Sequence, residues 1–215
     1  MPSFFLHFRS KSLSLLQNEY AMNDAVRLLE PKPLWNYFAD LNAVPRPSKK
    51  EERVIAFMKQ FGEHLKLPVH VDAAGNVIIK KPASKGMEGR QTVVLQSHLD
   101  MVHQKNSDTQ FDFNTQGIEM FVEGDWVKAK GTTLGADNGI GVAAIMSLLA
   151  SDSIAHPPIE ALFTIHEETG MTGALALKGG LLDGKILLND PNTTSGMMPS
   201  SFFFHQAAEI GLNPS

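Results

Sequence analysis

Apolar residues gather into three short runs between residues 93 and 188, and the runs have the length of buried strands. They cover residues 93–96, 159–165 and 185–188. Apolar residues at 140–150 and small residues at 172–177 predict helices that separate these strands. Strands that alternate with helices predict an α/β fold with a mostly parallel central sheet and helices on both faces.

The segments before residue 66 predict helices that serve packing. Apolar positions at helical spacing predict a helix over Pro33–Leu41 and another from about Lys49 to Leu65. Ser48 is the expected N-cap of the second helix, and Glu51 completes a capping box. The remaining strands, of which the first two form a hairpin, are expected at residues 69–71, 76–80 and 126–130.

Composition narrows the classes of function. The chain of 215 residues contains no cysteine and carries a formal net charge of −4. Disulfides and thiolate zinc sites are excluded, no basic surface for nucleic acid is indicated, and no apolar run reaches the roughly eighteen residues of a membrane span. A bound metal must be held by His, Asp and Glu, which favours a hydrolytic zinc, manganese or cobalt site. The lack of cysteine also fits a cytoplasmic protein.

His98 and Asp100 stand at the end of the first of the three strands. Side chains alternate between faces along an extended segment, so these two point to the same side. A carboxylate that accepts a hydrogen bond from one ring nitrogen orients a histidine so that its other nitrogen can bind a metal. Taken alone, a histidine in this pattern is more often a partly buried turn residue.

Four further carboxylates lie where a metal site needs them. Glu167 and Glu168 follow the second strand, Asp190 follows the third, and Asp137 lies in a glycine-flanked loop that opens a helix. Because ligands bind beyond the carboxyl ends of strands in open α/β sheets, these side chains are expected to meet His98 in one crevice. Singly, Asp137 could be a helix cap, Asp190 a turn residue and the glutamates a solvated helix start. Four further histidines are taken as surface or core residues: His103, His156, His166 and His205.

Three separated segments carry motifs that follow one another in a fixed order. They are residues 97–102 (SHLDMV), 130–141 (KGTTLGADNGIG) and 167–174 (EETGMTGA). These motifs resemble those of the aminoacyl-histidine dipeptidases, also called peptidase D, Xaa-His or cytosol non-specific dipeptidases. That family lies within the co-catalytic zinc aminoacylase and dipeptidase superfamily. The resemblance extends from about Pro31 to Asn189 and includes residues 31–35, 45–48 and 104–108.

The resemblance implies a site with two divalent metals, zinc first and cobalt or manganese as alternatives. His98 would bind one metal with Asp100 as its orienting partner. Asp137 would bridge both metals, Glu168 would bind the second, and Asp190 would join His98 on the first. Two such ions polarise a scissile carbonyl and lower the pKa of the attacking water.

The resemblance also implies a base and a substrate. Glu167 would be the general base that takes a proton from a metal-bound water, and dipeptides of the Xaa-His type would be hydrolysed. Small peptides are therefore the expected partners, with no nucleic acid and no membrane. Removing Glu167 is expected to cost most of the rate and to spare metal binding.

The chain departs from the family pattern near its end. The family has one residue between Asn and Asp after the third strand, whereas Asn189 and Asp190 are adjacent. A one-residue slip turns a side chain to the opposite face, which weakens Asp190 as a ligand. Residues 192–215 resemble nothing in the family, and the family's lid domain, which forms its homodimer, and its last histidine ligand have no counterpart. We expect residues 1–21 to be an extension, 22–190 a partial catalytic domain, and 191–215 a divergent, truncated or frameshifted tail.

Three functions are open from the sequence. The first is metal-dependent hydrolysis of dipeptides. The second is an inactive or unstable fragment that binds at most one metal. The third is an aminoacylase or carboxypeptidase with the same metal core, which the extended match to dipeptidase motifs disfavours.

Overall fold

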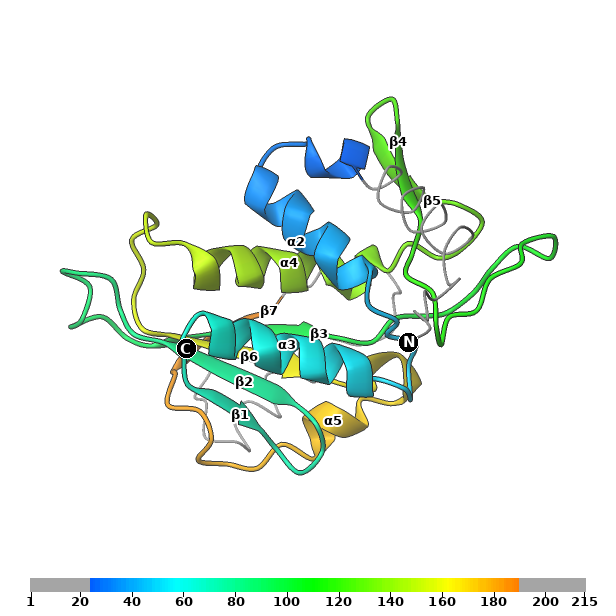
Figure 1. The fold of residues 1–215 in the computed structure, drawn as a ribbon. Coiled ribbons are helices and arrows are strands. Elements are labelled where there is room, and N and C mark those ends of the chain that lie inside the picture. Colours follow the sequence, from blue (N-terminus) through cyan, green and yellow to red (C-terminus); the bar gives the residue numbers. More distant parts are fainter. Residues whose placement is uncertain (1–23, 190–215) are drawn as a thin grey trace, which may run out of the picture.

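A five-stranded sheet runs through residues 24–189, the part of the chain that the computed structural model describes (Figure 1). The spatial order of the strands is β1-β2-β6-β3-β7. All six residues of the central strand, β6, are buried, as its apolar run predicts. The strands are β1 Val69–Val71, β2 Val77–Lys81, β3 Val93–His98, β6 Ile159–Thr164 and β7 Ile186–Asn189.

The sheet is mixed. β3 is parallel to both β6 and β7, whereas β2 is antiparallel to β6 and β1 is antiparallel to β2. The expected α/β class is confirmed, and the parallel pairing is confined to the half that contains β3. Residues 82–92, which join β2 to β3, contain no helix. Neighbouring parallel strands need a crossover of a dozen or more residues, so this short connection fits two strands that run in opposite directions with β6 between them.

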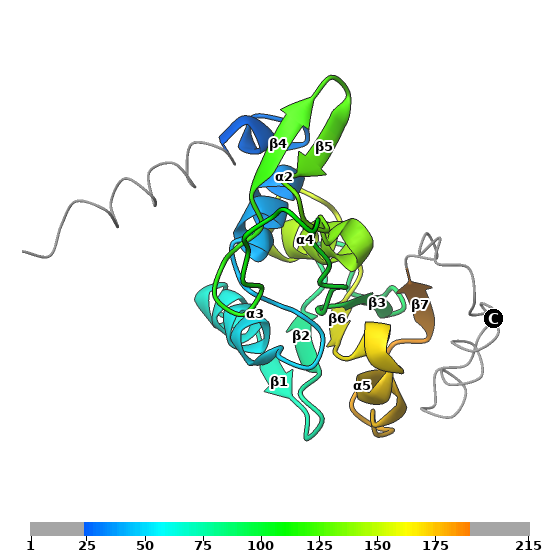
Figure 2. The ribbon, with the colours of Figure 1, turned by 90° about the vertical axis from the view of Figure 1, so that its right-hand side faces the viewer.

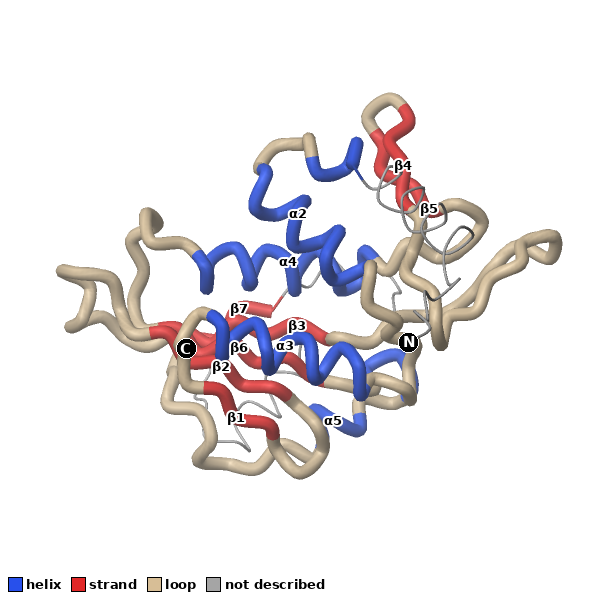
Figure 3. The backbone as a smooth tube through the Cα atoms, in the orientation of Figure 1, coloured by secondary structure: helices blue, strands red, loops and turns tan. Residues whose placement is uncertain are grey.

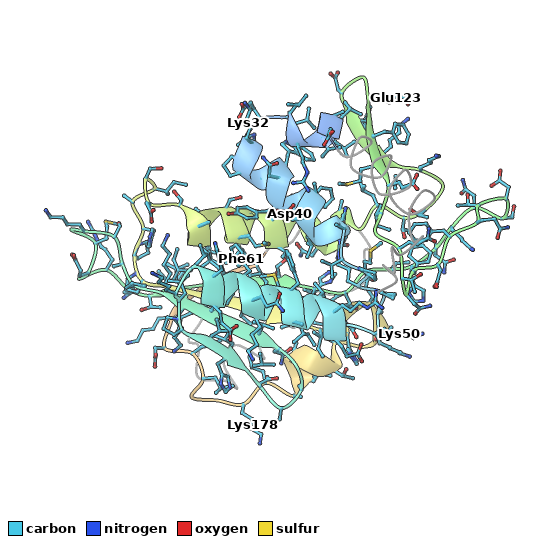
Figure 4. The ribbon with its side chains drawn as sticks, in the orientation of Figure 1. Lys32, Asp40, Lys50, Phe61, Glu123 and Lys178 are labelled. Carbon is cyan, nitrogen blue, oxygen red and sulfur yellow. The ribbon has the colours of Figure 1, made fainter. Side chains whose placement is uncertain are left out.

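Three helices form layers above one face of the sheet. They are α2 Lys32–Asn42, α3 Glu52–His64 and α4 Ala136–Ala150. α3 and α4 pack on the sheet, and α2 lies on α4 (Figures 1 and 3). Phe61 lies on the side of α3 that faces α2 (Figure 4), and its ring meets that of Tyr37 edge-on at 5.5 Å. The opposite face is covered by leucines at 177, 181 and 182, which follow the short helix α5, Thr172–Leu175.

α4 is apolar around most of its circumference because it lies between the sheet and α2. Its first residues are not regular helix. Asp137 and Asn138 have non-helical backbone angles, and the peptide bond between them is cis. The regular helix therefore starts at Gly139, close to the predicted start, and Asp137 is presented on an irregular turn.

A hairpin forms a second, two-stranded sheet and projects from the main body (Figure 2). Its strands are β4 Met120–Glu123 and β5 Trp126–Ala129. The strand expected at 126–130 is confirmed, and its partner β4 was not predicted. Met120 is buried with residues of α2 and α4, so the hairpin is anchored at its base.

The predicted capping box at Ser48 is wrong. Glu51 is the residue that precedes α3, and its side chain does not cap the helix. The Ser48 hydroxyl instead donates a hydrogen bond to Asp100 Oδ2 at 2.8 Å. Of the sequence predictions, those for residues 1–21 and 191–215, for Asp190 and for His205 lie outside the described residues. Within the described part, no helix has both the length and the apolar character to cross a bilayer.

Candidate metal and catalytic site

The pairing of β3 with β6 brings two of the predicted segments to one edge of the sheet. His98 ends β3 and is paired with Thr164, the last residue of β6. The chain continues from β6 into a 3₁₀ turn, Glu167–Thr169, which begins with the two glutamates. The start of α4 is tied to the same edge because the Ser97 hydroxyl donates to the carbonyl of Asn138 at 3.1 Å.

The imidazole of His98 lies between two carboxylates. Its Nδ1 is 3.1 Å from the backbone carbonyl of Asp100 and 3.4 Å from Oδ1 of the same residue. Its Nε2 is 3.0 Å from Asp137 Oδ1 and 3.9 Å from Glu167 Oε2. One ring nitrogen is therefore held by Asp100, and the other faces the acidic groups.

A group able to hold a metal is formed by His98, Asp137 and Glu168. One ligand atom from each of these side chains lies within 4.8 Å of the other two. No other such group of three or more occurs in the described part of the chain. His98 is almost fully buried, whereas the Asp137 side chain is 41% exposed. The metal-binding group is therefore buried at His98 and open to solvent at Asp137.

Asp100 is fully buried, and its carboxylate contacts several residues of the site. Besides His98 and Ser48, it accepts hydrogen bonds from the backbone N–H groups of Glu167 at 3.0 Å and Glu168 at 3.2 Å. Burial alone would raise the pKa of Asp100, but the hydrogen bonds and the charge of His98 outweigh it and hold the pKa below its ordinary value. Asp100 is therefore an ionised anchor beneath the site.

The other titratable groups respond to the crowding of negative charge. Burial lowers the pKa of His98, but hydrogen bonds to Asp100 and Asp137 and the nearby carboxylates outweigh it and raise the pKa to about 10. The pKa values of Glu167 and Glu168 are both raised, first by burial and then by neighbouring carboxylates. The proton on His98 offsets part of the negative charge, and a divalent cation would do so more strongly. The donor set of imidazole and carboxylates fits zinc, cobalt or manganese.

Arg46 fixes the two ligand-bearing loops to each other. Its guanidinium is buried and donates to the carbonyl oxygens of Leu99 at 3.0 Å and Gly135 at 2.6 Å. It also donates to Asn42 Oδ1 at 2.9 Å. Desolvation lowers the pKa of Arg46 to about 10, against the opposing charges of Asp100 and Asp137, so the group is still cationic at neutral pH.

The guanidinium of Arg46 also explains two glycines of the loop before α4. A Cβ added at Gly135 would lie 2.5 Å from an Arg46 nitrogen, and one at Gly139 would lie 2.7 Å from the same atom. Gly135 in addition has a φ of +68°, which side chains other than glycine rarely adopt. The glycines beside Asp137 thus make room for the arginine that braces the loop.

The structure brings together five of the six residues that the sequence predicted for the site. They are His98, Asp100, Asp137, Glu167 and Glu168, and Asp190 lies outside the described residues. Sequence reasoning missed Arg46 and the role of Ser48, although both lie in the segment 45–48 that carries part of the family resemblance. The glycines at 135 and 139 were a signal that a large side chain packs against this loop.

Comparison with known proteins identifies this α/β fold as that of peptidases. Over 168 residues the chain is 46% identical to the cytosol non-specific dipeptidase of Escherichia coli. This match covers 78% of this chain and 35% of that protein. The crystal structure of aminoacylhistidine dipeptidase from Vibrio alginolyticus superposes with a TM-score of 0.75 at 51% identity, over 76% of this chain and 34% of that one. Aminopeptidase PepT from Bacillus cereus gives a TM-score of 0.62 at 26% identity, over 74% and 42% of the two chains.

The class that the fold and these relatives define is that of the dipeptidases and aminopeptidases. No family model matches the chain. In sequence and fold the chain resembles part of the aminoacyl-histidine dipeptidases, the cytosol non-specific dipeptidases. It spans about a third of the length of these relatives.

Proposed function

We propose that the chain carries the metal-binding and proton-transferring residues of a metal-dependent dipeptidase. The observation that carries the proposal is the group formed by His98, Asp137 and Glu168, with Glu167 beside it but not part of it. The relatives are peptidases, which supports the peptide bond as the bond that is hydrolysed.

In this proposal His98, Asp137 and Glu168 hold divalent metal. The metal, when bound, supplies Lewis-acid polarisation of the scissile carbonyl and lowers the pKa of water. Asp100 orients His98 through Nδ1, so that Nε2 points to the carboxylates of the metal-binding group. The predicted roles of Asp137 as a bridge between two ions and of Asp190 as a further ligand are part of the same proposal.

Glu167 is the proposed general base. Its carboxylate lies 3.9 Å from His98 Nε2, on the edge of the metal-binding group. Its backbone N–H is held by Asp100, which fixes the residue without occupying its carboxylate. Burial and the neighbouring carboxylates raise its pKa above the ordinary value, against the opposing charge of His98, which suits a group that takes a proton and later returns it to the leaving amine.

Dipeptides, of which the Xaa-His type is the first to test, are the proposed substrates. The names of two relatives support this choice, since one is a cytosol non-specific dipeptidase and the other an aminoacylhistidine dipeptidase. The first of these names also supports the cytosol as the proposed compartment.

Removal of metal is expected to abolish hydrolysis by the full chain. After dialysis against a chelator, the release of histidine from an Xaa-His dipeptide should fall to the uncatalysed rate. Addition of zinc, cobalt or manganese should restore it, because the donor set accepts each of these ions. Absence of hydrolysis with every one of these metals would exclude the proposed function, and full activity without metal would exclude its mechanism.

Metal affinity is expected to rise with pH. The pKa of His98 in the metal-free protein is about 10, above the ordinary value of 6.5, so at neutral pH its imidazole holds a proton that a metal must displace. The apparent association constant for zinc should therefore increase about tenfold per pH unit between about pH 6 and 8, with about one proton released per ion at this ligand. Competition with a chromophoric chelator measures the affinity, and calorimetry in buffers of different ionisation enthalpy counts the protons. A flat affinity without proton release would contradict the expectation.

A further inference from the structure

Two buried carboxylates bind three consecutive backbone N–H groups at the turn that carries the proposed base. The N–H groups of Glu167 and Glu168 donate to the two oxygens of Asp100, at 3.0 and 3.2 Å. The N–H group of the residue before them, His166, donates to Glu51 Oε1 at 3.3 Å. Consecutive N–H groups of this kind form a concave site that favours negative charge. The turn is therefore fixed by Glu51 as well as by Asp100.

Glu51 makes two more contacts that strengthen this attachment. Its Oε2 lies 3.2 Å from Nε2 of the His166 imidazole. Its Oε1 also accepts the backbone N–H of Lys49 at 2.9 Å. Glu51 therefore binds His166 through both the backbone and the ring, and it joins the loop before α3 to the turn after β6.

Both residues whose N–H groups meet Glu51 Oε1 have left-handed backbone conformations. The φ angles are +73° at Lys49 and +57° at His166. Residues other than glycine are uncommon in this region and are held there by their surroundings. The carboxylate of Glu51 supplies such a restraint, because one oxygen accepts from both backbones.

Burial of the Glu51 carboxylate has a large desolvation cost that packing alone does not explain. Glu51 is 2% exposed, and it lies near the fully buried Asp100, a like charge. A buried carboxylate is tolerated where hydrogen bonds and opposite charge replace its hydration. Here the hydrogen bonds come from the backbone N–H groups of Lys49 and His166, the His166 ring lies beside the carboxylate, and the Glu51 side chain does not cap α3.

We propose that Glu51, with His166, is a positioning residue that sets the orientation of Glu167 in the catalytic turn. The inference rests on the proposed function, since it assigns Glu51 to the base of that same site. Glu51 acts through the backbone of His166, one residue before Glu167, and does not itself touch substrate. Loss of its carboxylate frees the first N–H of the turn and leaves Asp100 alone to hold the other two.

The test compares the full chain with Glu51→Ala, Glu51→Gln and Glu51→Asp, and uses Glu52→Ala as the matched control because Glu52 is exposed on the adjacent position. In Glu51→Ala, kcat for an Xaa-His dipeptide is expected to fall by about 10- to 100-fold, with KM changed less than about threefold and bound zinc unchanged. Glu51→Gln should recover most of the rate, because its carbonyl oxygen can still accept from both N–H groups. Glu52→Ala should behave as the unaltered chain.

Amide hydrogen exchange of a peptide that covers residues 163–171 supplies a readout that does not depend on turnover. Glu51→Ala should exchange at least about tenfold faster there than the unaltered chain and equally elsewhere. If Glu51→Ala does not fold, Glu51→Asp decides, because its shortened carboxylate should lower kcat and protection in a folded protein. Unchanged kcat and exchange in the folded variants would overturn the inference. An unaltered chain without hydrolysis would refute the proposed function instead, and exchange would still report on Glu51.

Discussion

Glu167→Gln is expected to lower kcat for dipeptide hydrolysis by about 100- to 10,000-fold, the range over which general acid–base catalysis contributes. Glutamine keeps the size of the side chain and the backbone hydrogen bond to Asp100 but cannot take a proton. Zinc content and KM should stay close to those of the unaltered chain, because Glu167 is not part of the group formed by His98, Asp137 and Glu168. Steady-state kinetics with metal analysis of the same samples measures both effects.

The neighbouring Glu168→Gln variant separates a base from a ligand. Glu168 contributes an oxygen to the metal-binding group, so its substitution should lower zinc affinity and remove activity through loss of metal. Excess zinc should restore part of the rate in Glu168→Gln and none in Glu167→Gln. The opposite result would mean that the roles of the two adjacent glutamates are exchanged.

Arg46→Ala is expected to lower the free energy of unfolding by about 3–5 kcal/mol, which for a domain of this size corresponds to roughly 10 °C in Tm. The substitution leaves the carbonyls of Leu99 and Gly135 and the amide oxygen of Asn42 without their donor. Each such buried acceptor costs about 1–3 kcal/mol when unsatisfied. Urea unfolding of the metal-free protein, followed by circular dichroism, measures the change.

A matched control for this variant is Arg53→Ala. Arg53 is exposed on α3 and has the same side chain without the buried contacts, so its substitution should change stability by less than about 0.5 kcal/mol. Zinc affinity should fall in Arg46→Ala and not in Arg53→Ala, because Arg46 joins the loop of Asp100 to the loop of Asp137. An Arg46→Ala protein as stable as the unaltered chain would show that the loops keep their positions without it.

Much of the fold could be predicted from apolar runs. β3 and β6 are largely buried, and the apolar runs in their sequences predict this burial. The convergence of His98 with Glu167 and Glu168 follows from the parallel pairing of the two strands. The antiparallel half was harder to predict, because a strand's own sequence does not give the direction of its neighbour. The helix-free connection between β2 and β3 was the available signal.

The unpredicted features share a physical cause. Arg46 and Glu51 are charged residues in a loop and before a helix, and local pattern assigns such residues to solvent. Their burial depends on partners more than 50 positions away, such as Leu99 for Arg46 and His166 for Glu51. β4 was missed because its short apolar segment follows a long polar stretch, although the Gly124–Asp125 turn marked a hairpin with β5.

The arginine that joins the ligand loops has a consequence for protein engineering. The site is assembled from four segments that are distant in sequence: the end of α2 with the loop after it, the end of β3, the turn before α4 and the turn after β6. Arg46, Asp100 and Glu51 link these segments through hydrogen bonds. A graft of the His98–Asp100 motif alone into another scaffold would transfer the metal-ligating histidine without the buried groups that hold it in position. The transferable unit is the set of four loops with their buried charges, and its dimensions set the smallest scaffold that could receive it.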